Sequence, residues 1–244
     1  MKKLFSIIIL LFAFSFQIAA QYQFSQPDFF RKKRNLPILD IPTSVDVKIS
    51  DFGAFPNDGK DDSEGIIKAL DFCKKVSITG SGIKLIFNKG TYDFFTTKES
   101  DRPFFIFLNN ANNILIEGNG AEIIIHDPLR GFFSVFKSNN IIVKDLFIDY
   151  DPLPFTQGKV LAVDVENKSF DLKIDAGFPT FAHEMFQKAP GSWGMLMDPT
   201  IPGKLKDGAP NLFGSKDFQE ISSGVFRIKF PNVGLLKHVE VGDS

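Results

Sequence analysis

Two aspartates in the middle of the chain, Asp149 and Asp151, have a spacing that suits chemistry. On a strand, residues two apart point to the same side, with about 6.5 Å between their Cα atoms. Two carboxylates placed in this way can flank a glycosidic bond, where one donates a proton and the other attacks or activates water. They can also supply oxygen ligands to calcium. The remaining alternative is a solvated outer face on which Asp151 starts a turn with Pro152.

The residues around this pair alternate as a strand does. Asp145 is at an odd-numbered position like Asp149, whereas the apolar residues Leu146, Ile148 and Tyr150 are at even-numbered positions. The pattern predicts a strand whose carboxylates point outward and whose apolar side chains point inward.

A second group of candidates lies in a long segment, Phe181 to Gln219, that has no sustained hydrophobic period. Ordered loops of this length are usually functional or mobile. Trp193 is the only tryptophan of the chain and is placed to stack on a sugar ring, although a lone tryptophan more often anchors a loop. His183 and Asp198 are weaker candidates for contacts with the same substrate.

Other kinds of site find little support. The three histidines, His126, His183 and His238, sit on separate segments without the spacing of a zinc site, so we expect no metal there. Gly118-Asn119-Gly120 looks like part of a dinucleotide fingerprint, but that site needs a helix after the glycines. Here Glu122 to Ile125 continues as a strand. The glycines are therefore expected to turn a corner, and no cofactor is expected.

The elements that must position these residues include a repeat. The stretch Phe104 to Gly118 matches the stretch Gly131 to Asp145, with Asn112-Asn113 over Asn139-Asn140 at an offset of 27 residues. Each unit reads strand, polar turn, strand, without a helical period, which excludes helical solenoids and predicts stacked parallel β-coils. Matching asparagines can hydrogen-bond to each other from coil to coil. Two unrelated hairpins with a similar turn are the alternative.

Before the repeat, a strand, a turn and one helix are expected. Val47 to Ile49 alternates as a strand, and Asp51 to Gly59 is rich in turn residues. Asp61 and Glu64 fit a capping box. The spacing of apolar residues then predicts an amphipathic helix over Ser63 to Lys74, which packs over the first coil and covers its open end through Ile66, Leu70 and Cys73.

After Pro152 the pattern changes to antiparallel hairpins. Lys159 to Val165 and Phe170 to Ile174 flank a polar turn and predict one hairpin. Phe226 to Phe230 alternates as a further strand, and Val239 with Val241 is expected to begin another.

The amino terminus has the pattern of an exported protein. Lys2 and Lys3 precede an apolar run and then Ala19-Ala20, which predicts a signal peptide over residues 1–20, too short for a membrane span. The run Arg31 to Arg34 lies in a polar leader over residues 21–45, best interpreted as solvated. We expect a periplasmic or extracellular protein without a membrane anchor.

Charge and cysteine content narrow the possible partners of the protein and the interactions that can stabilise its fold. The chain carries 28 basic and 29 acidic residues, which gives no reason to expect nucleic acid as a partner. The one cysteine, Cys73, permits no disulfide within the chain, so the core alone must stabilise the fold. The 29 phenylalanines are expected to fill that core.

The residues Asp51 to Ala54 and Asn57 to Ser63, followed by Gly82 to Tyr92, resemble the opening motif of the pectate-lyase-like superfamily of right-handed parallel β-helix proteins. That superfamily includes polygalacturonases, pectate lyases and phage tailspikes. The resemblance implies a fold, and the motif is not specific for one reaction.

The segment Asp149 to Gly158 is similar to one in a branch of exported β-helix glycosidases, among them bacterial α-1,3-galactosidases. The resemblance implies an all-β fold: a right-handed parallel β-helix with a capping helix over residues 46–155, and an inserted small antiparallel β-barrel over residues 156–244. In these relatives the catalytic carboxylates lie on later coils. The chain is therefore expected to be the amino-terminal part of a longer enzyme and inactive by itself.

The favoured reaction is glycoside hydrolysis, on a glycan or polysaccharide that the sequence does not specify. One rival is a polysaccharide lyase, which needs a base and often calcium to hold a uronate. Another is a non-catalytic glycan-binding or adhesion β-helix. A hydrolase releases sugar without an unsaturated end, a lyase makes a new double bond, and an adhesin releases nothing.

Overall fold

The computed structural model describes residues 41–77, 82–95, 103–189, 193–201, 203–210, 212–215, 217–230, 234 and 236–244. All of them belong to one compact unit, Asp40–Ser244, and most regular structure in it is β-strand. The expected signal peptide, most of the leader and its Arg31 to Arg34 run lie outside the described residues. No helix in the described part of the chain is long and apolar enough to cross a membrane.

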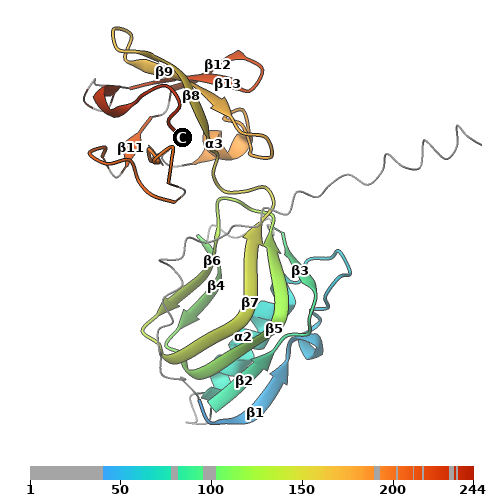
Figure 1. The fold of residues 1–244 in the computed structure, drawn as a ribbon. Helices are drawn as coiled ribbons and strands as arrows, with labels where there is room; N and C mark the ends of the chain where they lie inside the picture. The colour runs from blue at the N-terminus through green and yellow to red at the C-terminus, as the bar shows by residue number, and fades with distance from the viewer. Residues whose placement is uncertain are drawn as a thin grey trace, which may run out of the picture. The chain divides into compact units, whose positions relative to one another are not determined.

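Parallel strands dominate the first part of this unit (Figure 1). One sheet pairs its strands in the order β1-β2-β5-β3, with β7 also on β5, and a second sheet pairs β4 with β6. Every pairing in both sheets is parallel. The strands are β1 (Thr43–Lys48), β2 (Gly82–Ile86), β3 (Thr91–Phe94), β4 (Phe104–Asn109), β5 (Asn112–Ile125), β6 (Gly131–Phe136) and β7 (Asn139–Tyr150).

The predicted repeat is confirmed by the register of these strands. Phe104 pairs with Gly131 and Asn112 with Asn139, both at the expected offset of 27 residues. Figure 1 shows β5 and β7 as long, bent neighbours. Their bend is the expected corner, at Gly118–Gly120 in β5 and at Asp145 in β7, where the register shifts.

Glycine is needed at this corner for a steric reason. A Cβ atom on Gly118 would lie 2.2 Å from the carbonyl oxygen of Asp145 in the next strand. Asn119, Gly120 and Asp145 all have positive φ angles, which short polar residues and glycine accept most readily. The Asn119 side chain then donates a hydrogen bond to the carbonyl of Phe87 at 2.9 Å and joins the corner to the strand before it.

The predicted helix is confirmed as α2 (Ser63–Ser77). Ile66, Leu70 and Cys73 are buried and belong to one apolar cluster with the parallel strands. The predicted capping box is wrong. Asp61 accepts a hydrogen bond from the Ser63 N–H at 3.0 Å, but Glu64 turns outward to Lys68 at 2.6 Å, where an exposed ion pair forms along the helix.

The turn-rich opening motif has a structural role. A 3₁₀ helix, η2 (Ile49–Phe52), ends at Gly53, whose φ is 91°. Helix α2 packs so closely on this turn that a Cβ atom on Gly65 would lie 2.9 Å from the Ala54 nitrogen. Asn57 accepts a hydrogen bond from the Thr91 N–H at 2.9 Å and so joins the motif to β3. The motif therefore packs against the start of α2 and connects it to β3.

The second part contains the expected hairpins as a four-stranded antiparallel sheet in the order β12-β13-β9-β8. In the described part of the chain, β12 and β8 are the edge strands of this sheet. The expected closed barrel therefore remains a prediction. Strands β10 and β11 form a separate antiparallel ribbon. The elements are β8 (Gly158–Asp164), β9 (Ser169–Ile174), α3 (Glu184–Lys188), β10 (Trp193–Gly194), β11 (Phe213–Gly214), β12 (Asp217–Ser222), β13 (Val225–Lys229) and the 3₁₀ helix η3 (Leu236–His238).

The strand predicted at Val239 and Val241 is wrong. Val239 is buried, Val241 is 68% exposed, and the segment turns at Gly242, whose φ is 97°. A tertiary contact overrides the alternating pattern, because buried Asp243 accepts two hydrogen bonds from Lys206 at 2.8 and 2.9 Å. The carbonyl of Asp243 also accepts the Val160 N–H.

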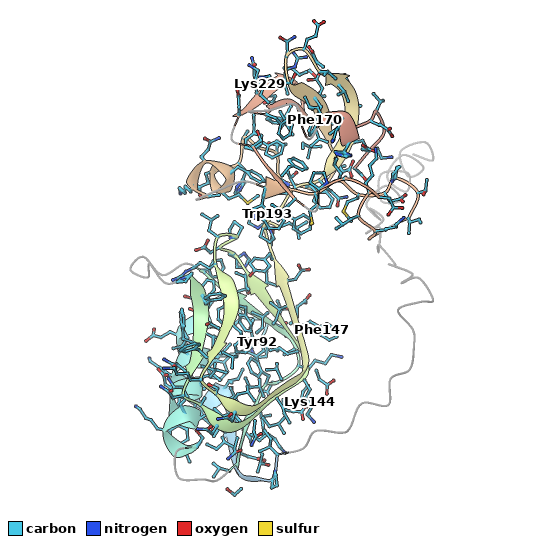
Figure 2. All side chains as sticks on the ribbon, turned by 90° about the vertical axis from the view of Figure 1, so that its left-hand side faces the viewer. Tyr92, Lys144, Phe147, Phe170, Trp193 and Lys229 are labelled. Atoms are coloured by element: carbon cyan, nitrogen blue, oxygen red, sulfur yellow. The ribbon has the colours of Figure 1, made fainter. Side chains whose placement is uncertain are left out.

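Two apolar clusters form the interior. The first lies among the parallel strands and α2, and the second lies among the antiparallel strands. Figure 2 shows Tyr92 within the first and Phe170 within the second, whereas Phe147 points into solvent. Phenylalanine fills both clusters, as predicted, through edge-to-face pairs such as Phe94 with Phe105.

The last parallel coil leaves inward positions uncovered. Ile123 is fully buried, but Ile148, its partner in the next strand, is 42% exposed. Leu108 is likewise buried, and its partner Val135 is 51% exposed. The predicted inward direction of Ile148 follows from the register. Ile148 is nevertheless exposed, because no described strand pairs with β7 on this side.

Candidate functional site

Asp149 and Asp151 lie at the exposed end of β7. Asp149 Oδ1 accepts a hydrogen bond from the Tyr150 N–H at 2.8 Å, and the Asp151 N–H donates to the Ile125 carbonyl at 3.1 Å. Between them, Tyr150 points inward and donates its hydroxyl to the Arg130 carbonyl at 2.9 Å, where burial raises the pKa of the tyrosine. The alternating pattern thus leaves both carboxylates on the outer surface.

The register brings a third carboxylate into this surface. Asp93 on β3 pairs with Ile124, and Ile124 pairs with Asp149, so the two aspartates flank one residue in the same row. Two strand spacings separate their Cα atoms by about 9–10 Å. The carboxyl groups of inverting glycosidases stand roughly 6.5–9.5 Å apart, with room for a water. The row therefore brings two carboxylate-bearing residues onto positions on either side of Ile124 on one strand face.

The Asp93 carboxylate is hydrogen-bonded to His126. His126 Nε2 lies 2.7 Å from Asp93 Oδ1, and His126 Nδ1 lies 3.1 Å from the carbonyl oxygen of Asp151. The Phe95 ring stacks on the imidazole with centroids 4.2 Å apart and an interplanar angle of 6°. The geometry is that of a hydrogen-bonded His126–Asp93 pair, packed under the Phe95 ring, between neighbouring strand ends.

A second buried carboxyl group supports this pair from the helix start. Asp62 is 3% exposed and accepts hydrogen bonds from the N–H groups of Phe55 and Asp93, at 2.9 and 3.1 Å. Burial raises the pKa of Asp62 to about 6, although the two N–H groups lower it. Asp62 therefore fixes β3 against the opening motif and is turned away from solvent.

Two of the three candidates in the long segment have local structural roles. His183 begins α3, and its Nδ1 accepts a hydrogen bond from the Met185 N–H at 3.3 Å. Asp198 closes a turn by accepting hydrogen bonds from the hydroxyl and the N–H of Thr200, at 2.7 and 2.9 Å. These bonds hold the pKa of Asp198 at about 2. Both side chains thus make local structural hydrogen bonds, and their contact with a substrate remains a prediction.

Trp193 differs from both. It is 66% exposed on β10, opposite Gly214 of β11, so it is not the buried loop anchor of the alternative interpretation. The ribbon has two distinct faces. On the inner face, Phe213 contacts the rings of Phe170 and Phe230. On the outer face, exposed Met195 has the parity of Trp193.

The structure therefore places the predicted residues in two separate groups. Asp149 and Asp151 lie on the parallel strands, where they are joined by Asp93 and His126, which sequence reasoning missed. The corner of β5 contains more residues than the corner of β7, so the offset between paired residues changes from 27 before the corner to 25 after it. The β3–β5 offset is 31, so the alignment of Asp93 with Asp149 does not follow the 27-residue repeat. No three His, Cys, Asp or Glu side chains among the described residues gather closely enough to hold a metal ion.

Comparison with known proteins gives one consistent relationship. The chain is 36% identical over 152 residues to α-1,3-galactosidase A of Shewanella woodyi, covering 57% of this chain and 24% of that protein. It is 27% identical over 219 residues to α-1,3-galactosidase B of Bacteroides thetaiotaomicron, covering 80% of this chain and 34% of that protein. A third relative is α-1,3-galactosidase B of Phocaeicola vulgatus, 24% identical over 138 residues. No family model matches the chain.

These relatives are glycosidases by name, so the chain is related to glycoside hydrolases. It spans between about a quarter and a third of the length of the first two. The relationship agrees with the glycosidase branch expected from the sequence.

Proposed function

We propose that this chain forms the first coils and the inserted sheet of an exported glycoside hydrolase that acts on glycans bearing α-1,3-linked galactose. The match over 219 residues to a protein named α-1,3-galactosidase B carries the proposal, because it covers more residues than either part of the chain contains. The substrate comes from the names of the relatives, and the fold supports it by presenting carboxylates on an outer strand face.

The parallel strands support a β-helix as the scaffold. Three strands in succession, β2, β5 and β7, pair in parallel through the same row positions. The β4–β6 pair repeats at the same offset on a second face. When each repeat places its strand beside the equivalent strand of the repeat before, the chain forms stacked coils. The turn residues lie at the corners, where such a coil must change direction. We propose the right-handed parallel β-helix for this reason.

Apolar side chains of β6 and β7 are exposed on the side away from the preceding coil, which is relevant to the position of the catalytic residues. Val135, Val143 and Ile148 are each more than 40% exposed, although their partners in the preceding coil are buried. Burial of such side chains stabilises a protein by about 25 cal/mol per Å² of apolar surface, so a further coil on this side is favourable. We propose that the catalytic carboxylates lie on such coils and that this chain by itself does not hydrolyse glycans.

Within the chain, Asp149 and Trp193 are the residues that we propose to contact the glycan. Asp149 is exposed, and its Oδ1 accepts a hydrogen bond from the N–H of its neighbour Tyr150. Trp193 offers an open indole face, which suits the apolar side of a pyranose ring. Asp149→Asn should weaken glycan binding or turnover and leave the unfolding free energy nearly unchanged.

Product analysis tests the proposed reaction. The natural polypeptide that carries this chain should release monosaccharide from a panel of galactose-containing glycans, without absorbance from an unsaturated sugar end. A new absorbance that disappears with chelator would indicate a lyase that uses calcium. Retention on glycan without any product would indicate an adhesin.

Export is a separate part of the proposal. Lys2, Lys3 and the apolar run up to Ala20 support it. Terminal sequencing of the secreted protein should begin at Gln21, whereas a protein that keeps Met1 in the cytoplasm would contradict export.

A further inference from the structure

His126 lies where the ends of three neighbouring strands meet. Its backbone N–H donates to the Phe94 carbonyl at 2.9 Å, and the Asp151 N–H donates to the Ile125 carbonyl at 3.1 Å. The imidazole reaches both neighbours, with Nε2 at 2.7 Å from Asp93 Oδ1 and Nδ1 at 3.1 Å from the Asp151 carbonyl oxygen. One side chain thus ties the end of β3 to the residue that follows β7.

Both groups that the ring faces are hydrogen-bond acceptors, a carboxylate and a carbonyl. A neutral imidazole has one N–H donor and one lone pair, whereas the imidazolium has two donors. Both hydrogen bonds of His126 therefore form only when the ring carries two protons. After loss of one proton, the donor is expected to stay with the Asp93 carboxylate, because charge-assisted bonds are stronger. The Nδ1 lone pair then faces the Asp151 carbonyl.

The surroundings hold the ring in this position. Phe95 stacks on it, and the Phe95 N–H donates to Asp61 Oδ1 at 3.3 Å. The Asp93 N–H donates to Asp62 Oδ2 at 3.1 Å. Among the described residues, the Asp93 carboxylate bonds to the ring itself. Asp61 and Asp62 bind the backbone of Phe95 and Asp93, and the nearest ionisable residues along the chain are Asp127, which lies 3.9 Å from Arg130, and the exposed Asp151.

Asp151 is also the last residue held by the parallel strands before the chain enters the antiparallel part. On the other side, the Gln157 side chain donates to Asp175 Oδ2 at 3.1 Å, and the Phe155 ring lies 5.7 Å from that of Phe178. Between these two anchors lie only Pro152, Leu153 and Pro154. The hold on Asp151 therefore defines one end of a very short link.

We propose that His126 is a proton-controlled clamp on this link. With two protons on the ring, His126 holds the Asp151 carbonyl and fixes the start of the link. With one proton, that bond is lost and the start of the link is released. Protonation adds the second donor, so lower pH favours the closed clamp and higher pH the open one.

Hydrogen exchange of the natural polypeptide that carries this chain tests the clamp. Protection of the Asp151 amide, which donates to the Ile125 carbonyl, should fall about fivefold to tenfold from pH 5 to pH 8 after correction for intrinsic exchange, as loss of the neighbouring hydrogen bond predicts. His126→Gln keeps a polar side chain that does not titrate, and its protection should be the same at both values. His183→Gln, which removes the other histidine with a known local bond, should keep the fall. An unchanged wild type, or a fall that survives in His126→Gln, overturns the proposal.

Nitrogen NMR of the His126 ring measures which ring nitrogens carry protons and tests the clamp without any variant. The wild-type His126 ring should carry protons on both nitrogens at pH 5 and on Nε2 alone at pH 8. A neutral ring with its proton on Nδ1 would mean that the Asp151 bond survives, which contradicts a clamp that opens.

Discussion

The side-chain amides of Asn113 and Asn140 are hydrogen-bonded to each other at 2.8 Å, although 27 residues separate them. Both residues have left-handed backbones, with φ of 54° and 53°. The neighbouring pair, Asn112 and Asn139, makes the same contact at 3.2 Å. The two turns therefore stack directly, which is the contact that the repeated asparagines predicted.

We expect Asn140→Ala to lower the unfolding free energy by about 1–2 kcal/mol, because it removes the amide bond and strains a left-handed backbone. A double-mutant cycle of Asn113→Ala and Asn140→Ala should give a coupling of about 0.5–1 kcal/mol. The matched cycle of Asn113 with Asn119, whose amide bonds to Phe87 instead, should give none. Zero coupling in the first cycle would mean that the turns do not stack.

The burial of α2 predicts a strong effect of a charge on its inner face. Leu70 is 3% exposed in the first apolar cluster, so Leu70→Asp should lower the unfolding free energy by about 3 kcal/mol. Lys75→Asp places the same side chain on the exposed face and should cost less than about 1 kcal/mol. Denaturant unfolding measures both. A loss below 1 kcal/mol for Leu70→Asp would mean that the helix faces water.

Asp62 predicts a specific dependence of stability on pH. Burial raises the pKa of this carboxyl from 3.8 to about 6, so the folded state binds its proton more tightly than the unfolded chain. The stabilisation from Asp62 is therefore complete below about pH 4 and is lost as the pH rises through about 6. Between those values wild type should lose about 1–2 kcal/mol relative to Asp62→Asn.

Denaturant unfolding at several pH values measures this difference, and each variant is compared with wild type at the same pH. Asp71→Asn, at an exposed position of α2, should follow the wild-type curve. Parallel curves for wild type and Asp62→Asn would contradict the assigned titration.

The two faces of the β10–β11 ribbon predict opposite effects of truncation. Trp193→Ala should change the unfolding free energy by less than about 0.5 kcal/mol, because the indole is exposed. Phe213→Ala should lower it by about 2–3 kcal/mol, because that ring packs on Phe170 and Phe230. A large loss for Trp193→Ala would return the tryptophan to the role of a loop anchor.

Local patterns were sufficient to predict much of the fold. The offset between Asn112 and Asn139 predicted parallel stacking, and the spacing of Ile66, Leu70 and Cys73 predicted α2, because both signals depend on residues close in the sequence. The strand expected at Val239 failed for the opposite reason. Its path is set by Lys206 and Asp243, which lie far apart along the chain.

The candidate site was less accessible from the sequence. Asp149 and Asp151 were found because they lie on one strand. Asp93 and His126 were not, because β3 pairs with β5 at an offset of 31 residues, which differs from the repeat of 27 found in the sequence. The local hydrogen bonds of His183 and Asp198 were not predicted either, since a side chain that caps a helix or closes a turn has the same composition signal as one that binds a ligand.

The release of galactose from a defined pair of linkage isomers tests the proposed function most directly. The natural polypeptide that carries this chain is incubated with a galactosyl disaccharide in the α-1,3 linkage and, separately, with its α-1,4 isomer, and free galactose is measured by chromatography. The account predicts release from the α-1,3 isomer and little from the α-1,4 isomer. No galactose from either isomer, with the protein folded, would contradict it.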